Sequence, residues 1–355
     1  MLHSVYNSAT QMQHACFILG AMEILNGEKI AMIKIKLTFL TITVTFLSLT
    51  LSSSLALSAS TAGAFLKIDP SARSYAMGQS GVVSALGAES MGSNPANLMD
   101  LPRKTELLTA YSSLTEGVSF GHIAGAINRS ANKDLMVDAL GFSYTRLGVD
   151  GIEGRDGIGN RTGDYGTADS QMSLTASGNA GRFKLGLTGK LVQSKIGNYK
   201  ANTVFAGDLG LSYGFKGLGR EMRGGLSLNN VGQGMRYLNQ KDPLPTAIHA
   251  GLTTQAGPMN LTGGLTQELK GEGTSVNFGM EFNLGVVSLR AGVNALGGVS
   301  GNKASGAAGI FEGLSSGLGL KLGMARVDYA LGQSSADLGI SHRASLTFQF
   351  GKQAN

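Results

Sequence analysis

The sequence places few side chains in arrangements that could do chemistry. Ser341 and His342 are adjacent on a predicted late strand. Neighbouring residues of a strand point to opposite faces, so these two cannot form a nucleophile–base pair with each other. The phosphate-binding, zinc-binding and nucleophile-elbow motifs of common enzymes do not occur. We therefore predict no catalytic residues, no cofactor and no enzymatic activity.

A second candidate for chemistry is a polar, glycine-rich segment that carries four acidic residues. Carboxylate oxygens of this kind could gather Ca²⁺, but their spacing matches no calcium-binding loop, and two arginines are interleaved with them. We predict a solvated extracellular loop over residues 148–166 and no metal site. The acidic residues are Asp150, Glu153, Asp156 and Asp164, and the arginines are Arg155 and Arg161.

Composition narrows the class of protein. The 355 residues include 53 glycines, charged residues make up only 15%, and the mean hydropathy is +0.07. Much glycine disfavours helices, and the modest hydropathy disfavours a helical membrane protein. Disorder would also allow much glycine, but it would not alternate apolar and polar residues along the chain. The net charge of +6 comes from scattered basic residues, which disfavours a nucleic-acid-binding protein.

Period-two alternation runs from about residue 104 to the end of the chain. In one example, Phe278, Met280 and Phe282 share a face, while Asn277 and Glu281 share the opposite face. Turn residues interrupt the pattern often enough to give about fourteen strands, an even number as in bacterial single-chain barrels. A soluble β-sandwich also alternates, but it usually holds fewer strands. The prediction is an all-β transmembrane antiparallel barrel.

The two faces of such strands predict where side chains lie. Charged side chains are costly on the lipid-facing surface, so those on the polar faces are expected to line the lumen. Tyrosines and phenylalanines near strand ends are candidates for the membrane interface. The possible lumen-lining residues are Lys184, Lys190, Arg290, Lys321, Arg326 and Asp328; the interface candidates are Tyr111, Tyr144, Tyr213, Tyr329 and Phe350.

An export signal precedes the strands. Lys34 and Lys36 come before an apolar stretch over residues 37–51, and small residues follow it. A membrane anchor is the alternative, but the stretch is short for a spanning helix, which needs about 20 residues. The predicted divisions are an upstream extension at 1–31, a signal peptide at 32–60, an amino-terminal lumenal plug at 61–103 and the barrel at 104–355.

Several segments resemble the PorV/PorQ family of outer-membrane proteins, which is similar in fold to the FadL-like fatty-acid transporters. The first and most specific segment begins at Gly63, ends at Leu98 and contains the plug motif Asn94, Pro95 and Ala96. Others lie at residues 226–232, 242–245, 327–330 and 337–346, so the resemblance spans the chain after the signal. It implies fourteen strands and an amino-terminal plug in the lumen.

The resemblance implies two functions and favours the first, an accessory role in protein export or surface attachment, over the second. PorV-type barrels assist type IX export by receiving exported proteins and passing them to surface-attachment enzymes. FadL-like barrels instead let hydrophobic molecules cross the membrane passively. A structural barrel without cargo is a third reading. The expected location is the bacterial outer membrane. The expected partners are outer-membrane lipid and lipopolysaccharide, the barrel-assembly machinery, and exported proteins or hydrophobic ligands, with no nucleic acid.

Overall fold

The computed structural model describes residues 61–115, 117–129, 137–197, 199–217, 219–237, 240–270, 273–297, 313–333 and 340–353. The predicted extension at 1–31 and signal peptide at 32–60 lie outside these residues. The described residues of 58–355 belong to one compact unit.

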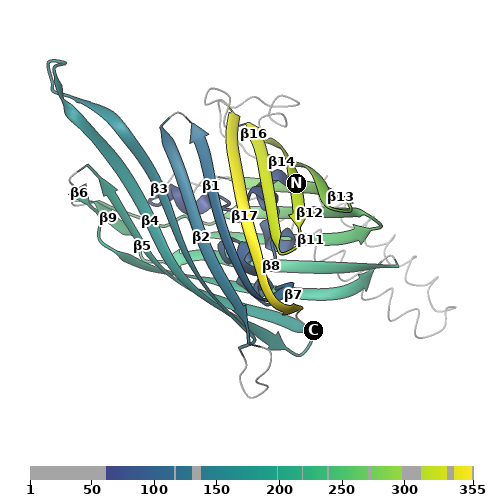
Figure 1. Cartoon of the computed structure of the whole chain (residues 1–355). Coiled ribbons are helices and arrows are strands. Elements are labelled where there is room, and N and C mark those ends of the chain that lie inside the picture. The colour runs from purple at the N-terminus through teal and green to yellow at the C-terminus, as the bar shows by residue number, and fades with distance from the viewer. Residues whose placement is uncertain are drawn as a thin grey trace, which may run out of the picture. The chain divides into compact units, whose positions relative to one another are not determined.

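Fourteen antiparallel strands form a closed ring (Figure 1), which confirms the predicted barrel and its number of strands. Each strand pairs with the next one, and β1 pairs with β17 to close the ring. The short strand β6 (Tyr199–Lys200) extends β5, and β9 (Met235–Tyr237) pairs with β10 (Gln240–Asp242) in a separate hairpin. The ring strands are β1 (Arg103–Thr115), β2 (Val118–Asn128), β3 (Ala139–Arg155), β4 (Arg161–Ala180), β5 (Phe183–Ile196), β7 (Val204–Gly217), β8 (Arg220–Gly232), β11 (Ala247–Ala256), β12 (Met259–Glu268), β13 (Thr274–Leu284), β14 (Val287–Gly297), β15 (Leu314–Leu322), β16 (Ala325–Gln333) and β17 (Ile340–Gln353).

The strands are two-faced, as their sequences predict. On β5, Leu187 is 57% exposed on the outer surface, whereas the next residue, Thr188, is fully buried on the inner surface. On β13, Phe278 and Met280 lie outside, while Glu281 is buried inside. The outer wall is therefore apolar and the lumen polar, the reverse of a soluble protein.

The two ends of the barrel differ in their connections. At one end, two-residue turns join β4 to β5, β11 to β12, β13 to β14 and β15 to β16, and each begins with a glycine of φ between 61° and 65°. Such a φ strains other residues, so glycine allows these tight turns. We call this the short-turn end, although β2 and β3 are also joined at this end, by residues 129–138. The opposite end, where most connections are longer except the one between β1 and β2, is the long-loop end.

The predicted extracellular loop at 148–166 is mostly strand, so that prediction is wrong in detail. Strands β3 and β4 continue beyond the wall as a hairpin whose turn spans residues 156–160 (Figure 1). A hairpin in water pairs its own backbone and requires no apolar face. Polarity therefore did not distinguish an irregular loop from this hairpin.

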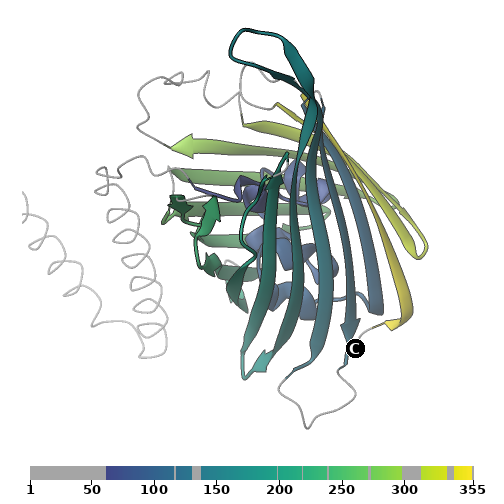
Figure 2. The same cartoon turned by 90° about the vertical axis from the view of Figure 1, so that its left-hand side faces the viewer.

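Short helices at the amino-terminal side of β1 lie inside the ring (Figure 2). They are η1 (Ala64–Lys67), α3 (Ala72–Ala76), α4 (Gly81–Ser84), η2 (Gly87–Gly92) and η3 (Pro95–Met99). We call residues 61–102 the lumenal segment. Its elements contact thirteen strands of the ring, and Arg73 contacts the fourteenth, β13. That the segment plugs the lumen against solutes stays a prediction. Among the described residues, no helix is long and apolar enough to cross a membrane.

Candidate functional site

Inward-facing glycines bring the wall against the lumenal segment. A Cβ added to Gly186 would lie 2.2 Å from the carbonyl carbon of Pro95, and one added to Gly292 would lie 2.0 Å from the nitrogen of Gly78. Real Cβ atoms never come so close, so glycine is required at both positions. On nine strands, an inward-facing glycine is so close to the lumenal segment that an added Cβ would lie within 3.0 Å of one of its atoms, either backbone or side chain. We call these nine glycines the glycine contact surface. They are Gly141, Gly186, Gly210, Gly225, Gly251, Gly279, Gly292, Gly317 and Gly332.

The Asn94-Pro95-Ala96 motif contacts this surface on β5 and β7. The Asn94 side chain accepts a hydrogen bond from the Ala96 nitrogen at 3.1 Å and so caps η3. Its Nδ2 donates to the Val82 carbonyl at 3.0 Å and to the Leu211 carbonyl of β7 at 3.2 Å. One buried side chain thus joins two parts of the lumenal segment to the wall.

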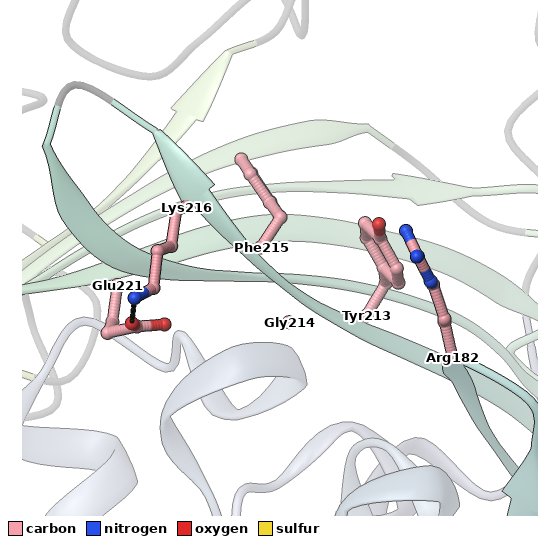
Figure 3. Close-up of a pocket in the computed structure, with 6 residues that line it drawn as sticks. All are labelled: Arg182, Tyr213, Gly214, Phe215, Lys216 and Glu221. Carbon is pink, nitrogen blue, oxygen red and sulfur yellow. Dashed lines mark ion pairs between the residues drawn. The ribbon is translucent and has the colours of Figure 1, made fainter.

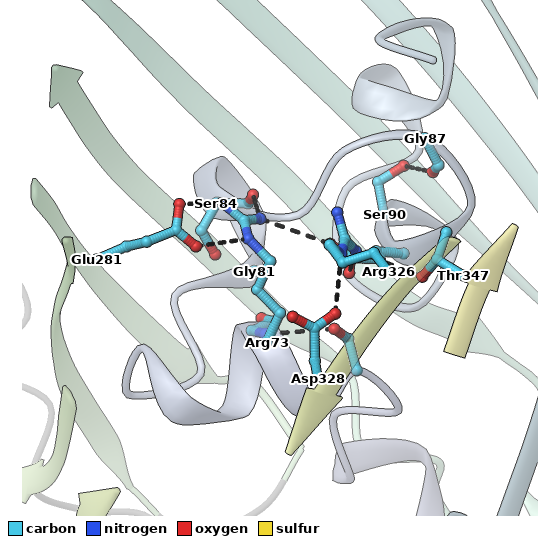
Figure 4. Close-up of polar contacts among 12 residues, drawn as sticks. Arg73, Gly81, Ser84, Gly87, Ser90, Glu281, Arg326, Asp328 and Thr347 are labelled. Atoms are coloured by element: carbon cyan, nitrogen blue, oxygen red, sulfur yellow. Dashed lines mark hydrogen bonds and ion pairs between the residues drawn. The ribbon is translucent and has the colours of Figure 1, made fainter. Parts of the chain in front are cut away.

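Six charged side chains form a closed ring in the lumen, which we call the ion-pair ring. Arg73 of α3 contacts Glu281 of β13 at 2.8 Å, and Arg290 of β14 contacts the same carboxylate at 2.7 Å. Arg290 also contacts Asp328 of β16 at 2.8 Å. Asp328 lies 2.8 Å from Arg326, which contacts Glu89 of η2. Figure 4 shows Arg73 with Glu281 and Arg326 with Asp328.

The ion-pair ring closes on itself, because Glu89 lies 3.5 Å from Arg73. Three arginines alternate with three carboxylates, so the buried charges balance. Burial by itself lowers the pKa of Arg73, but Glu281 and Glu89 raise it above its ordinary value. Arg73 also donates to the Ser84 carbonyl at 2.7 Å. The ring therefore links α3 and η2 to three strands through charged side chains that are at most 22% exposed.

The structure places the predicted lumen-lining residues in different surroundings. Arg290, Arg326 and Asp328 come together in the ion-pair ring. Lys190 lies apart from them, paired with Asp208 at 2.7 Å. Lys184 pairs with Asp100 just before β1. Lys321 is exposed near the short-turn end, in register with Arg326.

Sequence reasoning missed the partners of these charges. Arg73, Glu89 and Glu281 complete the ion-pair ring, and none of them was singled out. Glu281 did appear on the polar face of a predicted strand, next to Gly279. A carboxylate and a glycine on one inner face signal a close, charged contact, and that signal could have been used.

The other residues that the sequence singled out as candidates for catalysis or metal binding either point to opposite faces or pair with other side chains. Ser341 faces the lumen, 3.1 Å from the Tyr75 hydroxyl, while His342 faces outward, 2.7 Å from the Tyr329 hydroxyl. In the β3–β4 hairpin, Glu153 pairs with Arg155 and Asp164 with Arg161. Asp156 caps the turn, and the backbone N–H of Asn160 lowers its pKa. In the described part of the chain, no three potential metal ligands come together.

An apolar cluster interrupts the polar lumen near the long-loop end. Phe65 of η1 packs there against inward-facing Val192 and Val204, under Met235 of the β9–β10 hairpin. All four are at most 2% exposed. We call this the apolar lumenal cluster; its buried members are Ala62, Phe65, Val192, Ala201, Val204, Ala206, Met235 and Leu244.

These features define the class of protein. A closed antiparallel barrel with an apolar outer wall, a polar lumen, tight turns at one end and longer connections at the other is the architecture of bacterial outer-membrane proteins. The protein is an integral outer-membrane β-barrel. In such barrels the short turns face the periplasm, so the long-loop end faces outward.

Comparison with known proteins supports this fold. The chain is similar to the crystal structure of the Pseudomonas putida toluene transporter TodX, with a TM-score of 0.50 and 12% identity over 78% of this chain and 97% of that one. A deltaS2 mutant of the TodX monoaromatic hydrocarbon channel has a TM-score of 0.47 and 11% identity, covering 74% and 94%. Acinetobacter baumannii Omp33 has a TM-score of 0.38 and 8% identity, covering 70% and 99%.

No family model and no curated protein matches the chain. At 12% identity the similarity to TodX concerns the fold alone. The outer-membrane barrel fold expected from the sequence is confirmed, whereas membership of the PorV/PorQ family and of the FadL-like group stays a prediction.

Proposed function

We propose that the protein lets hydrophobic small molecules cross the outer membrane, and that they enter through the apolar lumenal cluster. The observation that carries this proposal is the cluster itself. A lumen used only by hydrophilic solutes has no need of eight buried apolar residues at its outward end. The fold is also similar to that of a toluene transporter. No enzymatic step is part of the proposal.

The way that η1 is held supports an entry at this point. Most of its contacts are apolar, with one backbone hydrogen bond from Ala62 to Pro243 at 3.0 Å and an ion pair between Lys67 and Glu268 at 2.7 Å. The later lumenal segment is held by the ion-pair ring and the glycine contact surface. We infer that an apolar ligand replaces Phe65 in the cluster, while residues 69–102 stay fixed and close the lumen to hydrophilic solutes.

Replacing Val204 with threonine tests this entry. The substitution keeps the shape of the side chain and adds a hydroxyl inside the cluster, where an unpaired hydroxyl costs about 1–3 kcal/mol. Uptake of radiolabelled toluene by cells lacking the native gene is expected to fall about tenfold relative to wild type, since about 1.4 kcal/mol is tenfold.

The matched control is Val231→Thr, because Val231 is 47% exposed on the outer wall of β8. It is expected to transport toluene as wild type does. Equal uptake by Val204→Thr and wild type, at equal amounts of folded barrel, contradicts entry through the cluster.

A second candidate is the predicted accessory role in type IX-like protein export or surface attachment. One observation favours it: the β3–β4 hairpin projects from the long-loop end and exposes apolar side chains, with Ile158 85% and Tyr165 44% exposed. Exposed apolar groups on a projecting element suit contact with another protein.

Shortening this hairpin separates the two candidates. Replacing residues 151–165 with an Asn-Gly turn keeps the pairing of Val149 with Thr167 in the wall. If the hairpin receives exported proteins, their display on the cell surface is expected to be lost while toluene uptake persists. Unchanged display, measured by surface proteolysis of an exported protein, contradicts the export role.

A further inference from the structure

A cavity of about 590 Å³ lies at the short-turn end, away from the lumenal cluster. It is lined by the turn between β4 and β5, the end of β7 and the start of β8 (Figure 3). The lining residues are Arg182, Tyr213, Gly214, Phe215, Lys216 and Glu221.

Aromatic rings form one side of this region. Phe183 is in register with Tyr213 on the neighbouring strand, and their ring centres lie 5.0 Å apart. Tyr213 stacks on Phe215 at 5.9 Å, two residues further along the same face of β7. This face also carries Phe205 and Leu209, which are exposed on the outer wall. The three rings therefore face lipid where the wall meets the periplasmic side, the depth at which aromatic residues favour the membrane interface.

Among the charged side chains that line the cavity, one cation is unpaired. Lys216 pairs with Glu221 at 3.2 Å, as the dashed line in Figure 3 shows. Arg182 lies beside Tyr213, and its guanidinium has no ion-pair or hydrogen-bond partner within the described residues. A guanidinium presents several N–H donors in a plane, which suits the oxygens of a phosphate. An unpaired arginine above a lipid-facing aromatic wall therefore complements a molecule with a phosphate next to an apolar chain.

We propose that this cavity binds one phospholipid of the periplasmic leaflet. Its phosphate contacts Arg182, and the upper part of one acyl chain lies along Tyr213 and Phe215. The site is independent of the transport proposal, because it lies at the short-turn end of the wall and not in the apolar lumenal cluster near the long-loop end. It fixes the depth of the β4–β5 and β7–β8 turns in the membrane through one bound lipid in addition to non-specific contact of the rings.

Native mass spectrometry of the folded, delipidated barrel tests this site. Phosphatidylglycerol is titrated into wild type, Arg182→Gln and Arg182→Lys, and diacylglycerol with the same chains serves as the probe without phosphate. Wild type is expected to retain one tightly bound phosphatidylglycerol. Arg182→Gln is expected to bind it about tenfold more weakly, because a charge-assisted contact is lost. Arg182→Lys is expected to recover part of the binding.

The matched control is Arg220→Gln, which removes an exposed arginine from the next turn without touching the cavity. Folding of each variant is checked by its heat-dependent mobility in electrophoresis. The proposal is overturned if Arg182→Gln binds phosphatidylglycerol as wild type does, or if Arg220→Gln weakens binding equally. It is also overturned if diacylglycerol binds as well as phosphatidylglycerol.

Discussion

Replacing Gly186 with leucine is expected to displace the lumenal segment and raise the permeability of the barrel to small hydrophilic solutes. Even the first carbon of the new side chain would meet backbone atoms, 2.2 Å from the carbonyl carbon of Pro95 and 2.3 Å from the nitrogen of Ala96. Backbone cannot rotate away as a flexible side chain can, so η3 must leave the wall. Overpacking of this kind costs about 1–3 kcal/mol even where neighbours can shift. The hydrogen bond from Asn94 to the Leu211 carbonyl is lost with it.

The measurement is the rate at which a periplasmic β-lactamase hydrolyses an externally added chromogenic cephalosporin in intact cells. The matched control is Gly189→Leu on the same strand. A Cβ at Gly189 meets nothing within 4 Å, and the position lies on the outer wall between Leu187 and Leu191. Only Gly186→Leu is expected to admit the solute faster. Equal rates in both variants, with both folded, would show that the segment does not plug the lumen.

Replacing Glu281 with glutamine is expected to give the largest loss of stability among single changes in the ion-pair ring. Its carboxylate contacts both Arg73 and Arg290, and glutamine leaves these two buried cations with one compensating charge fewer. Removing one partner of a buried pair typically costs about 3–5 kcal/mol. The measurement is the free energy of unfolding in urea, with the barrel reconstituted in lipid vesicles.

The comparison variant is Glu221→Gln, which breaks the pair with Lys216 at the short-turn end. Those two side chains are 72% and 83% exposed, so the loss is expected to be about 0–1 kcal/mol. Similar losses in the two variants would mean that the lumen is wet enough to screen the ion-pair ring. In that case the ring would not hold α3 and η2 to the wall.

The barrel could be predicted from the sequence because the pattern that produces it lies within each strand. Alternation of residues such as Phe278 and Glu281 reflects two solvents on two sides of one strand, and each strand carries that pattern by itself. The number of strands follows from counting such segments. The β3–β4 hairpin was mistaken for a loop because, beyond the membrane, neither face has to be apolar.

The contents of the lumen could not be predicted in the same way. Arg73 and Glu281 are 208 residues apart, and no local pattern shows which carboxylate an arginine will meet across a barrel. The glycines were read as small residues on the polar faces of strands. The alternation places Gly186 on the inner face of its strand and Gly189 on the outer face. It does not show that Gly186 must be glycine, because that depends on where the lumenal segment runs.

The position of the lumenal segment also constrains the order in which the protein can assemble. The segment touches all fourteen strands, yet it joins the chain directly before β1, and β1 completes the wall by pairing with β17. Once β1 and β17 have paired, the helices of the lumenal segment would have to enter a closed barrel from one end and pack against nine separate glycines. It is simpler for the sheet to curl around the helices, with the β1–β17 seam sealed last. The lumenal segment then determines the curvature of the wall in addition to filling the lumen.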